Sequence, residues 1–122
     1  MKKILLVDDE GDLINYIASV LQEEGFDVST RLSAEEALGT IMTDKPDLVI
    51  TDVRMEQMDG FTMLEKIKTM KGFSNVPVIF LTAMDDRIGQ QQAAKLGAAA
   101  YISKPFDLDE LVGLVKRVLP PT

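Results

Sequence analysis

Charged and hydroxyl side chains stand at the points where the apolar runs of this 122-residue chain stop. Asp8 and Asp9 directly follow the first run, and Asp52 follows the second. Thr82 comes at the end of the third run, and Lys104 follows the fourth. If these runs are parallel strands of one α/β sheet, their carboxyl ends share one edge, where such sheets bind ligands. We therefore expect three carboxylates, a hydroxyl and an ammonium group to converge.

This combination of groups favours phosphoryl chemistry. Neighbouring carboxylates raise one another's pKa unless a cation relieves the repulsion. Mg²⁺ prefers oxygen ligands and commonly takes one or two carboxylates plus a phosphate oxygen. An Asp can then act as the nucleophile that forms an aspartyl-phosphate, while Mg²⁺ and a Lys stabilise the transferring group. Asp52 is the expected nucleophile, Asp8 and Asp9 hold Mg²⁺, and Lys104 and Thr82 contact the phosphoryl group. Asp8 or Asp9 alone fits a solvated helix start at least as well, so the joint pattern carries this interpretation.

The strands expected to position these groups lack apolar/polar alternation, which is typical of strands buried on both faces of a parallel sheet. The four apolar runs are residues 4–7, 48–50, 76–81 and 98–102, and a short polar strand fits at 27–30.

Segments of helical period lie between the strands. Their apolar stripes are Leu13, Ile14, Ile17 and Leu21; Ala37, Leu38, Ile41 and Met42; Phe61, Leu64, Ile67 and Met70; and Leu108, Leu111, Val112, Val115 and Leu119. The sequences that begin at Ser33 and Asp107 predict capping boxes or close variants. This alternation predicts an α/β domain with a mostly parallel sheet and right-handed crossovers.

Two further expectations concern glycines. The helix at residues 85–96 should be weakly held, because Ile88, Ala93 and Leu96 form a thin apolar stripe and Gly89 costs about 1 kcal/mol relative to Ala. Gly60 is expected to serve a turn.

Composition excludes several function classes. The chain has no Cys and no His, which excludes disulfides, imidazole-dependent triads and the usual zinc sites. Its net charge of −7 disfavours binding to nucleic acid or to an anionic membrane and favours a protein partner. The first apolar run stops at Asp8, too early for a signal peptide, which predicts a cytoplasmic protein. We expect one domain over residues 1–119, with 120–122 as a tail or the start of a linker.

Four segments in order resemble the motifs of bacterial response-regulator receiver domains, the phosphoacceptor half of two-component phosphorelays. They are Ile4-Leu5-Leu6-Val7-Asp8-Asp9-Glu10; Leu48-Val49-Ile50-Thr51-Asp52-Val53-Arg54-Met55 with Met58-Asp59-Gly60; Pro77-Val78-Ile79-Phe80-Leu81-Thr82-Ala83; and Ala100-Tyr101-Ile102-Ser103-Lys104-Pro105-Phe106. The resemblance covers nearly the whole chain. It implies a flavodoxin-like (βα)5 three-layer sandwich with a central parallel five-stranded sheet in the order 2-1-3-4-5.

The resemblance also implies a set of site residues. Asp52 is the phosphoacceptor. Asp8, Asp9, Asp52 and the backbone carbonyl of Arg54 bind Mg²⁺, with Asp9 favoured over Asp8 as the direct ligand.

The phosphoryl-binding and switch residues follow from the same resemblance. Thr82, the backbone of Ala83 and Lys104 contact the phosphoryl group, and Thr82 and Tyr101 form the switch pair. Taken alone, Tyr101 equally fits a half-buried edge-strand aromatic. The bond from Lys104 to Pro105 is expected to be cis, which X-Pro bonds permit.

As a signalling phosphoacceptor rather than an enzyme, the chain is expected to take its phosphoryl group from a histidine kinase or a histidine phosphotransferase. It then acts on a downstream protein target or a fused output domain, as a monomer or a weak phosphorylation-dependent dimer. We expect the output face to comprise residues 85–96, 98–102 and the last helix.

Three residues depart from the family pattern. Glu56 stands where Pro is usual, which removes a fixed φ and adds a charge near the site. Ala99 and Ala100 replace an acidic pair that often precedes the Tyr in regulators that dimerise through helix 4, strand 5 and helix 5.

Two other function classes remain to be compared. A haloacid-dehalogenase-like phosphatase also uses a strand-end Asp and Mg²⁺. Its motif resembles D-x-D, with a second acid two residues after the nucleophile, whereas Arg54 occupies that position here. A flavodoxin-like cofactor carrier shares the topology, but its first strand leads to a phosphate-binding loop, whereas here it leads to acids.

Overall fold

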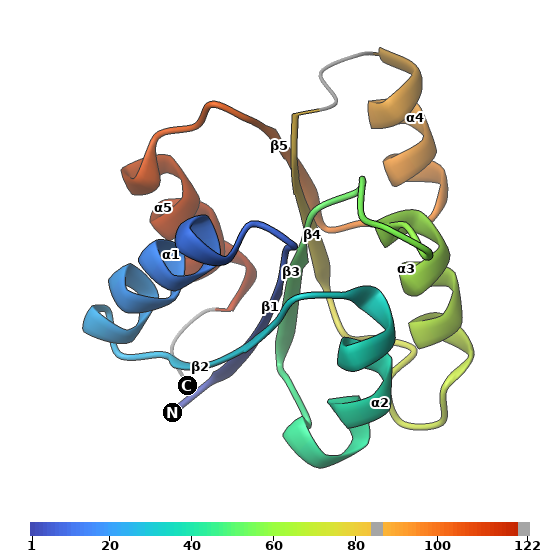
Figure 1. Cartoon of the computed structure of the whole chain (residues 1–122), viewed down its shortest axis with the longest axis horizontal. Helices are drawn as coiled ribbons and strands as arrows, with labels where there is room; N and C mark the ends of the chain where they lie inside the picture. The colour runs from blue at the N-terminus through green and yellow to red at the C-terminus, as the bar shows by residue number, and fades with distance from the viewer. Residues whose placement is uncertain (84–86, 120–122) are drawn as a thin grey trace.

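One parallel sheet with helices on both faces makes up the chain (Figure 1). The computed structural model describes residues 1–83 and 87–119, so the expected first residues of the 85–96 helix and the 120–122 tail lie outside the described residues. The sheet order is β2-β1-β3-β4-β5. The strands are β1 (Lys3–Val7), β2 (Asp27–Arg31), β3 (Leu48–Thr51), β4 (Val78–Thr82) and β5 (Ala100–Ser103). The flavodoxin-like fold and strand order expected from the sequence are confirmed.

The helices form the two outer layers of the sandwich. They are α1 (Gly11–Glu23), α2 (Ala34–Asp44), α3 (Gly60–Thr69), α4 (Arg87–Lys95) and α5 (Leu108–Val118). Helices α1 and α5 cover one face of the sheet, and α2, α3 and α4 cover the other (Figure 1). The longest described helix, α1, has 13 residues, whereas a bilayer span needs about 20. No helix in the described part of the chain can therefore cross a membrane.

Alternate residues of β1, β3, β4 and β5 enter two separate cores. In β1, Ile4 and Leu6 pack in the core below α1 and α5, whereas Leu5 and Val7 pack in the other core. The central strands β3 and β4 are buried at every position, whereas the edge strands β2 and β5 are mostly half-exposed. Burial on both faces is the reason that the central strands show no apolar/polar alternation.

Strands β4 and β5 begin two residues later than the sequence suggests, at Val78 and Ala100. Pro77 has no N–H group to donate to a ladder, although its carbonyl accepts a 3.0 Å bond from the Val49 N–H. The N–H of Ala98 donates to the carbonyl of Ala93 at 3.0 Å. This bond closes the C-terminal end of α4, so Ala98 belongs to the helix end rather than to the strand.

The expected apolar stripe of α4 was wrong at Ile88. Its side chain is 79% exposed, whereas Gly89 and Ala93 are buried. Positions 89 and 93 lie one turn apart on the same helix face, but 88 and 93 do not. The buried face of α4 therefore consists of small residues, and its large apolar residue lies in solvent.

The start of α2 is a variant of the capping box, as expected. The Ser33 hydroxyl accepts from the Glu36 N–H at 3.1 Å. The Glu36 carboxylate accepts from the N–H of Leu32 at 3.4 Å, one residue before the N-cap position that a full box uses. This reciprocal pair sets the point where the β2–α2 connection enters the helix.

Candidate functional site

Backbone ladders place the acids side by side at the carboxyl edge of the sheet. The β1–β3 pairing ends at Val7 opposite Thr51, so Asp8 and Asp52 are the next residues on neighbouring strands. The Asp52 N–H donates to the Val7 carbonyl at 3.1 Å, and the Asp8 N–H donates to the Arg31 carbonyl at 3.2 Å. The backbones of both acids are therefore continuations of the sheet.

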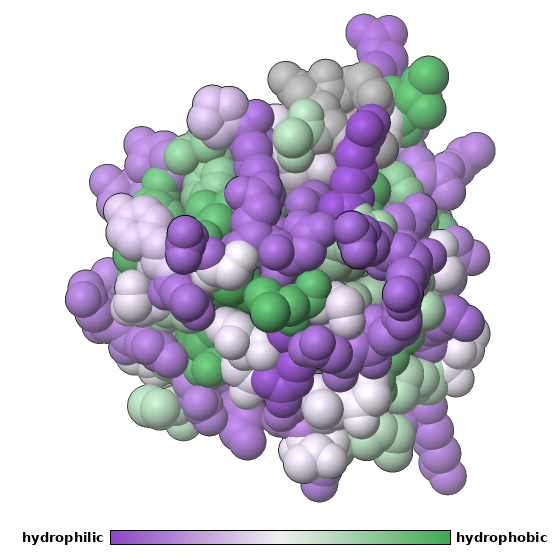
Figure 2. Space-filling view, in the orientation of Figure 1, coloured by the Kyte–Doolittle hydropathy of each residue, from purple (hydrophilic) through white to green (hydrophobic). Residues whose placement is uncertain are grey.

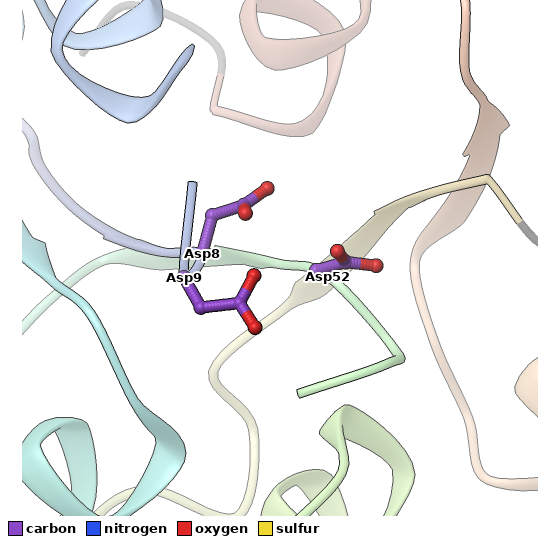
Figure 3. Close-up of side chains that lie close together, drawn as sticks. All are labelled: Asp8, Asp9 and Asp52. Atoms are coloured by element: carbon purple, nitrogen blue, oxygen red, sulfur yellow. The ribbon is translucent and has the colours of Figure 1, made fainter. Parts of the chain in front are cut away.

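The side chains of Asp8, Asp9 and Asp52 gather at this edge, with carboxylate oxygens that lie within 4.8 Å of one another. Figure 3 shows the first two, from the end of β1, extending toward the side where Asp52 lies at the end of β3. Asp8 is 2% exposed and Asp52 is 7% exposed, whereas Asp9 is exposed. Two buried carboxylates and one accessible carboxylate thus share one site, as the strand-end pattern predicts.

Lys104 bridges the two buried acids. Its Nζ lies 3.0 Å from Oδ2 of Asp8 and 3.4 Å from Oδ2 of Asp52. A longer contact of 3.7 Å reaches the exposed carboxylate of Glu10. Sequence reasoning assigned no role to Glu10, although its place directly after Asp9 at the start of α1 could have suggested one.

Burial and charge act in opposite directions on these groups. Burial raises the pKa of the Asp8 carboxyl, and neither the hydrogen bond from the Glu10 N–H nor Lys104 offsets it fully. Burial alone lowers the pKa of Lys104, but its hydrogen bond to Asp8 and the charges of Asp8, Asp52 and Glu10 outweigh burial and raise it. The ammonium therefore stays protonated, and the site retains an excess of negative charge.

The donor set fits a hard divalent cation. Mg²⁺ favours carboxylate oxygens and keeps several water ligands, which requires an accessible side to the site. The exposed Asp9 leaves that side open, while Asp8 and Asp52 lie deeper. A cation here would favour the ionised form of Asp8 by electrostatic attraction and so offset the effect of burial on its pKa.

The remaining residues expected at the site lie on neighbouring strand ends and loops. Thr82 is fully buried at the end of β4, and its carbonyl accepts from the Lys104 N–H at 2.7 Å. Ala83 follows it and is exposed. The N–H of Arg54 donates to Oδ1 of Asp52 at 3.3 Å, so the loop after β3 folds back on the acid.

Tyr101 and the Lys104–Pro105 bond lie in and after the edge strand β5. Tyr101 is partly buried and packs against the core covered by α2, α3 and α4. The peptide bond between Lys104 and Pro105 is cis, as the resemblance implies.

The sequence led us to expect that Gly60 serves a turn, but this residue begins α3 and lies against the backbone of Asp52. Its N–H donates to the Val53 carbonyl at 2.8 Å. A methyl group on its Cα would overlap the Asp52 carbonyl oxygen. Asp59, the N-cap of α3, accepts from the Thr62 N–H at 2.8 Å and places the helix start at this point. Gly60 is therefore needed for the close approach of the α3 start to the Asp52 backbone, and no local sequence pattern indicates that approach.

We predict that Gly60→Ala destabilises the fold by about 2–3 kcal/mol, because the added methyl group overpacks the Asp52 backbone. Gly39→Ala is the matched control: this glycine is inside α2 with no atom within 4 Å of its added Cβ. The control should gain up to about 1 kcal/mol from helix propensity alone. Urea unfolding followed by circular dichroism measures both, and a gain in stability for Gly60→Ala would contradict the close approach.

We also predict that Asp8→Asn stabilises the protein at pH 7 without divalent cations. The pKa of Asp8 is raised in the folded state, so folding favours its protonated form. The stability that this provides is complete below the ordinary pKa of Asp and is lost as the pH rises through the folded pKa, whereas Asn stays neutral throughout. The gain of the variant should therefore shrink as the pH falls toward about 4. Urea unfolding at several pH values measures it, with the exposed Glu65→Gln as control. A variant less stable than wild type at pH 7 would contradict the prediction.

Comparison with known proteins agrees with this geometry. The model of the response regulator receiver domain family matches residues 4–116. The heme response regulator HssR of Staphylococcus aureus is 38% identical over 119 residues, which cover 98% of this chain and 52% of that protein. The chain thus spans about half the length of the curated relatives it matches.

Solved structures of similar fold cover the chain almost completely. The chemotaxis protein CheY4 of Vibrio cholerae superposes with a TM-score of 0.91 at 29% identity, covering 97% of this chain and 98% of that one. The non-phosphorylated HemR receiver domain of Leptospira biflexa gives 0.91 at 30% identity, covering 100% of this chain and 97% of that one. The chain belongs to the response regulator receiver domain family.

Proposed function

We propose that this chain is a phosphorylation-controlled signalling domain that accepts a phosphoryl group on Asp52 in a Mg²⁺-dependent reaction. The observation that carries the proposal is the meeting of three carboxylates with Lys104 at the carboxyl edge of a receiver-family sheet. The donor is the phosphohistidine of a histidine kinase or histidine phosphotransferase. The recipient of the signal is a downstream protein or a fused output domain.

In the proposed transfer, a carboxylate oxygen of Asp52 attacks phosphorus and forms an O–P bond. The N–P bond of phosphohistidine breaks and its electron pair stays on that ring nitrogen, while the ring, protonated at its other nitrogen, leaves as neutral imidazole. Lys104 supplies a positive charge beside the attacking carboxylate. Asp8, Asp9, Asp52 and the Arg54 carbonyl would hold Mg²⁺, which would supply positive charge to the transferring phosphoryl group.

Neither alternative class is supported. The comparisons give receiver domains and response regulators, not haloacid-dehalogenase-like phosphatases. Arg54 occupies the position of the second acid of D-x-D. Its backbone N–H donates to the Asp52 carboxylate, and its side chain supplies no second carboxylate. The β1–α1 connection presents Asp8 and Asp9 to the site, and these acids would repel an anionic cofactor.

Phosphorylation is proposed to shift the domain between two states through Thr82, the Ala83 backbone and Lys104, with Tyr101 as the switch partner of Thr82. Hydrogen bonds to charged groups contribute about 1.5–3 kcal/mol each. A shift from 1:99 to 99:1 needs about 5.5 kcal/mol of differential binding. Several contacts to the phosphoryl group must therefore act together.

Output is proposed to leave through the face of α4, β5 and α5. Three features of this face support the proposal: β5 is an edge strand, α4 buries only small residues in its described part, and Ile88 is exposed. Elements held by few apolar contacts are the ones that can move at modest free-energy cost. Ala99 is exposed beside Tyr101 and leaves room for a partner's backbone.

We predict that Asp52 forms an acid-stable, base-labile phosphoryl adduct with acetyl phosphate only when Mg²⁺ is present. Intact mass spectrometry should show one added phosphoryl group in the wild type and none in Asp52→Asn or after EDTA treatment. Asp59→Asn, which changes an acid outside the acid site, is the matched control and should still form the adduct. An adduct that persists in both Asp52→Asn and EDTA would refute the assignment.

We predict that Thr82→Ala still becomes phosphorylated but responds only in part, because the other contacts to the phosphoryl group remain. Beryllofluoride, which imitates the phosphoryl group, should displace the NMR signals of residues 87–102 less in the variant than in the wild type. Thr62→Ala, an exposed threonine of α3, serves as the control. A full wild-type displacement in Thr82→Ala would remove this residue from the mechanism.

A further inference from the structure

A pocket of about 410 Å³ opens directly beside the acid site, and the charge of its lining affects which phosphoryl donors can approach. It is lined by Asp9, Leu32, Ser33, Glu56 and Gln57. Asp9 belongs to both the pocket and the acid group. Any donor that reaches Asp52 from this side passes the exposed carboxylate of Glu56.

Two contacts shape the turn that carries Glu56. Its carbonyl accepts a 2.8 Å bond from the Met58 N–H, across Gln57, whose φ is +69°. A non-glycine residue in this left-handed region is uncommon. The side-chain amide of Gln57 is assigned with its nitrogen toward Glu35 of α2, since the opposite orientation would bring oxygens together. These contacts tie the backbone of the turn to α2, and Glu56 of this turn lines the pocket.

No cation neutralises Glu56 in the described part of the chain. Its carboxylate forms no ion pair with a described Lys or Arg, and Lys104 is already engaged by Asp8, Asp52 and Glu10. Asp9 adds a second negative charge to the same pocket. The approach to Asp52 is therefore acidic beyond what the metal-binding carboxylates require.

The pocket face is polar around one apolar residue. Figure 2 shows a small apolar group near the centre of the view, over the connection between β2 and α2, with hydrophilic and near-neutral side chains around it. Leu32, in that connection, is 50% exposed. An apolar contact flanked by carboxylates suits a donor surface that carries an apolar side chain and positive charge.

We propose that Glu56 is a specificity-determining residue that selects the class of phosphoryl donor. It disfavours small dianionic donors and favours a phosphohistidine whose surroundings carry positive charge. This inference rests on the proposed function, because it assumes that Asp52 accepts the phosphoryl group. Glu56 acts through its charge on the approaching donor, not through contact with the reacting atoms.

Two small phosphoryl donors that differ in net charge and in the bond that breaks allow the effect of the Glu56 charge to be measured. Acetyl phosphate carries about −1.5 to −2 charges near neutral pH, as phosphate groups in general do. Its O–P bond breaks and acetate leaves with the electron pair. Monophosphoimidazole offers the N–P bond of phosphohistidine on a ring that can be protonated, which offsets part of its negative charge. Its imidazole leaves with the electron pair and a proton.

The test measures second-order rate constants for both donors at pH 7 and saturating Mg²⁺. Because the chain has no Trp, adduct formation is followed by mass spectrometry of quenched samples. In Glu56→Gln, the rate constant for acetyl phosphate should rise about threefold to tenfold at an ionic strength of about 0.05 M. The rate constant for monophosphoimidazole should change less than about twofold, and the gain should vanish at about 0.5 M, where screening is strong.

The exposed Glu65 of α3 provides the matched control, because Glu65→Gln changes the net charge equally but lies outside the pocket. Equal gains for both donors, a gain that persists at high salt, or the same gain in Glu65→Gln would each overturn the proposal. Adducts that form in every variant with an unchanged donor ratio would overturn the role of Glu56 and leave the proposed function standing. No Asp52 adduct in wild type with either donor would overturn both.

Discussion

The accumulation of negative charge at one sheet edge is the constraint on which the rest of the structure depends. Asp8 and Asp52 are buried next to each other, and burial raises the pKa of the Asp8 carboxyl because it disfavours the ionised form. A single ammonium, that of Lys104, bridges them, and it comes from a position 96 residues after Asp8 in the sequence. One positive charge does not balance three carboxylates, so the folded domain is left with a site that favours a further cation.

The two apolar cores make this charged edge tolerable. Strands β3 and β4 are buried along their whole length, and helices on both faces exclude water from them. Burial of apolar surface stabilises such a domain by about 25 cal/mol per Å². Because the core lies along the strands and the charges lie at their carboxyl ends, the strands hold the acids rigidly while the cost of burying charge is confined to one edge.

Some loop residues at that edge position Asp52, and Glu56 affects which phosphoryl donor approaches it. The loop after β3 returns an N–H to Asp52 through Arg54, and Gly60 lets α3 begin against the Asp52 backbone. Between them, Glu56 lies at the wall of the adjoining pocket, where its charge faces the approach to the site. This arrangement is typical of α/β domains, in which a rigid sheet positions the reacting group and variable loops determine what reaches it.

The sequence by itself determined the local chemistry of this protein. Apolar runs located four of the five described strands, with β4 and β5 starting two residues later than expected, and helical stripes located α1, α2, α3 and α5. The polar residues after the runs predicted the grouping of Asp8, Asp9 and Asp52. These inferences succeed because they depend on residue type and short spacing. Tertiary structure decided the rest: the need for Gly60, the solvent-facing side of Ile88 and the engagement of Glu10 with Lys104. Each depends on which backbone or helix face lies opposite, and packing between segments distant in the sequence, rather than local pattern, determines that.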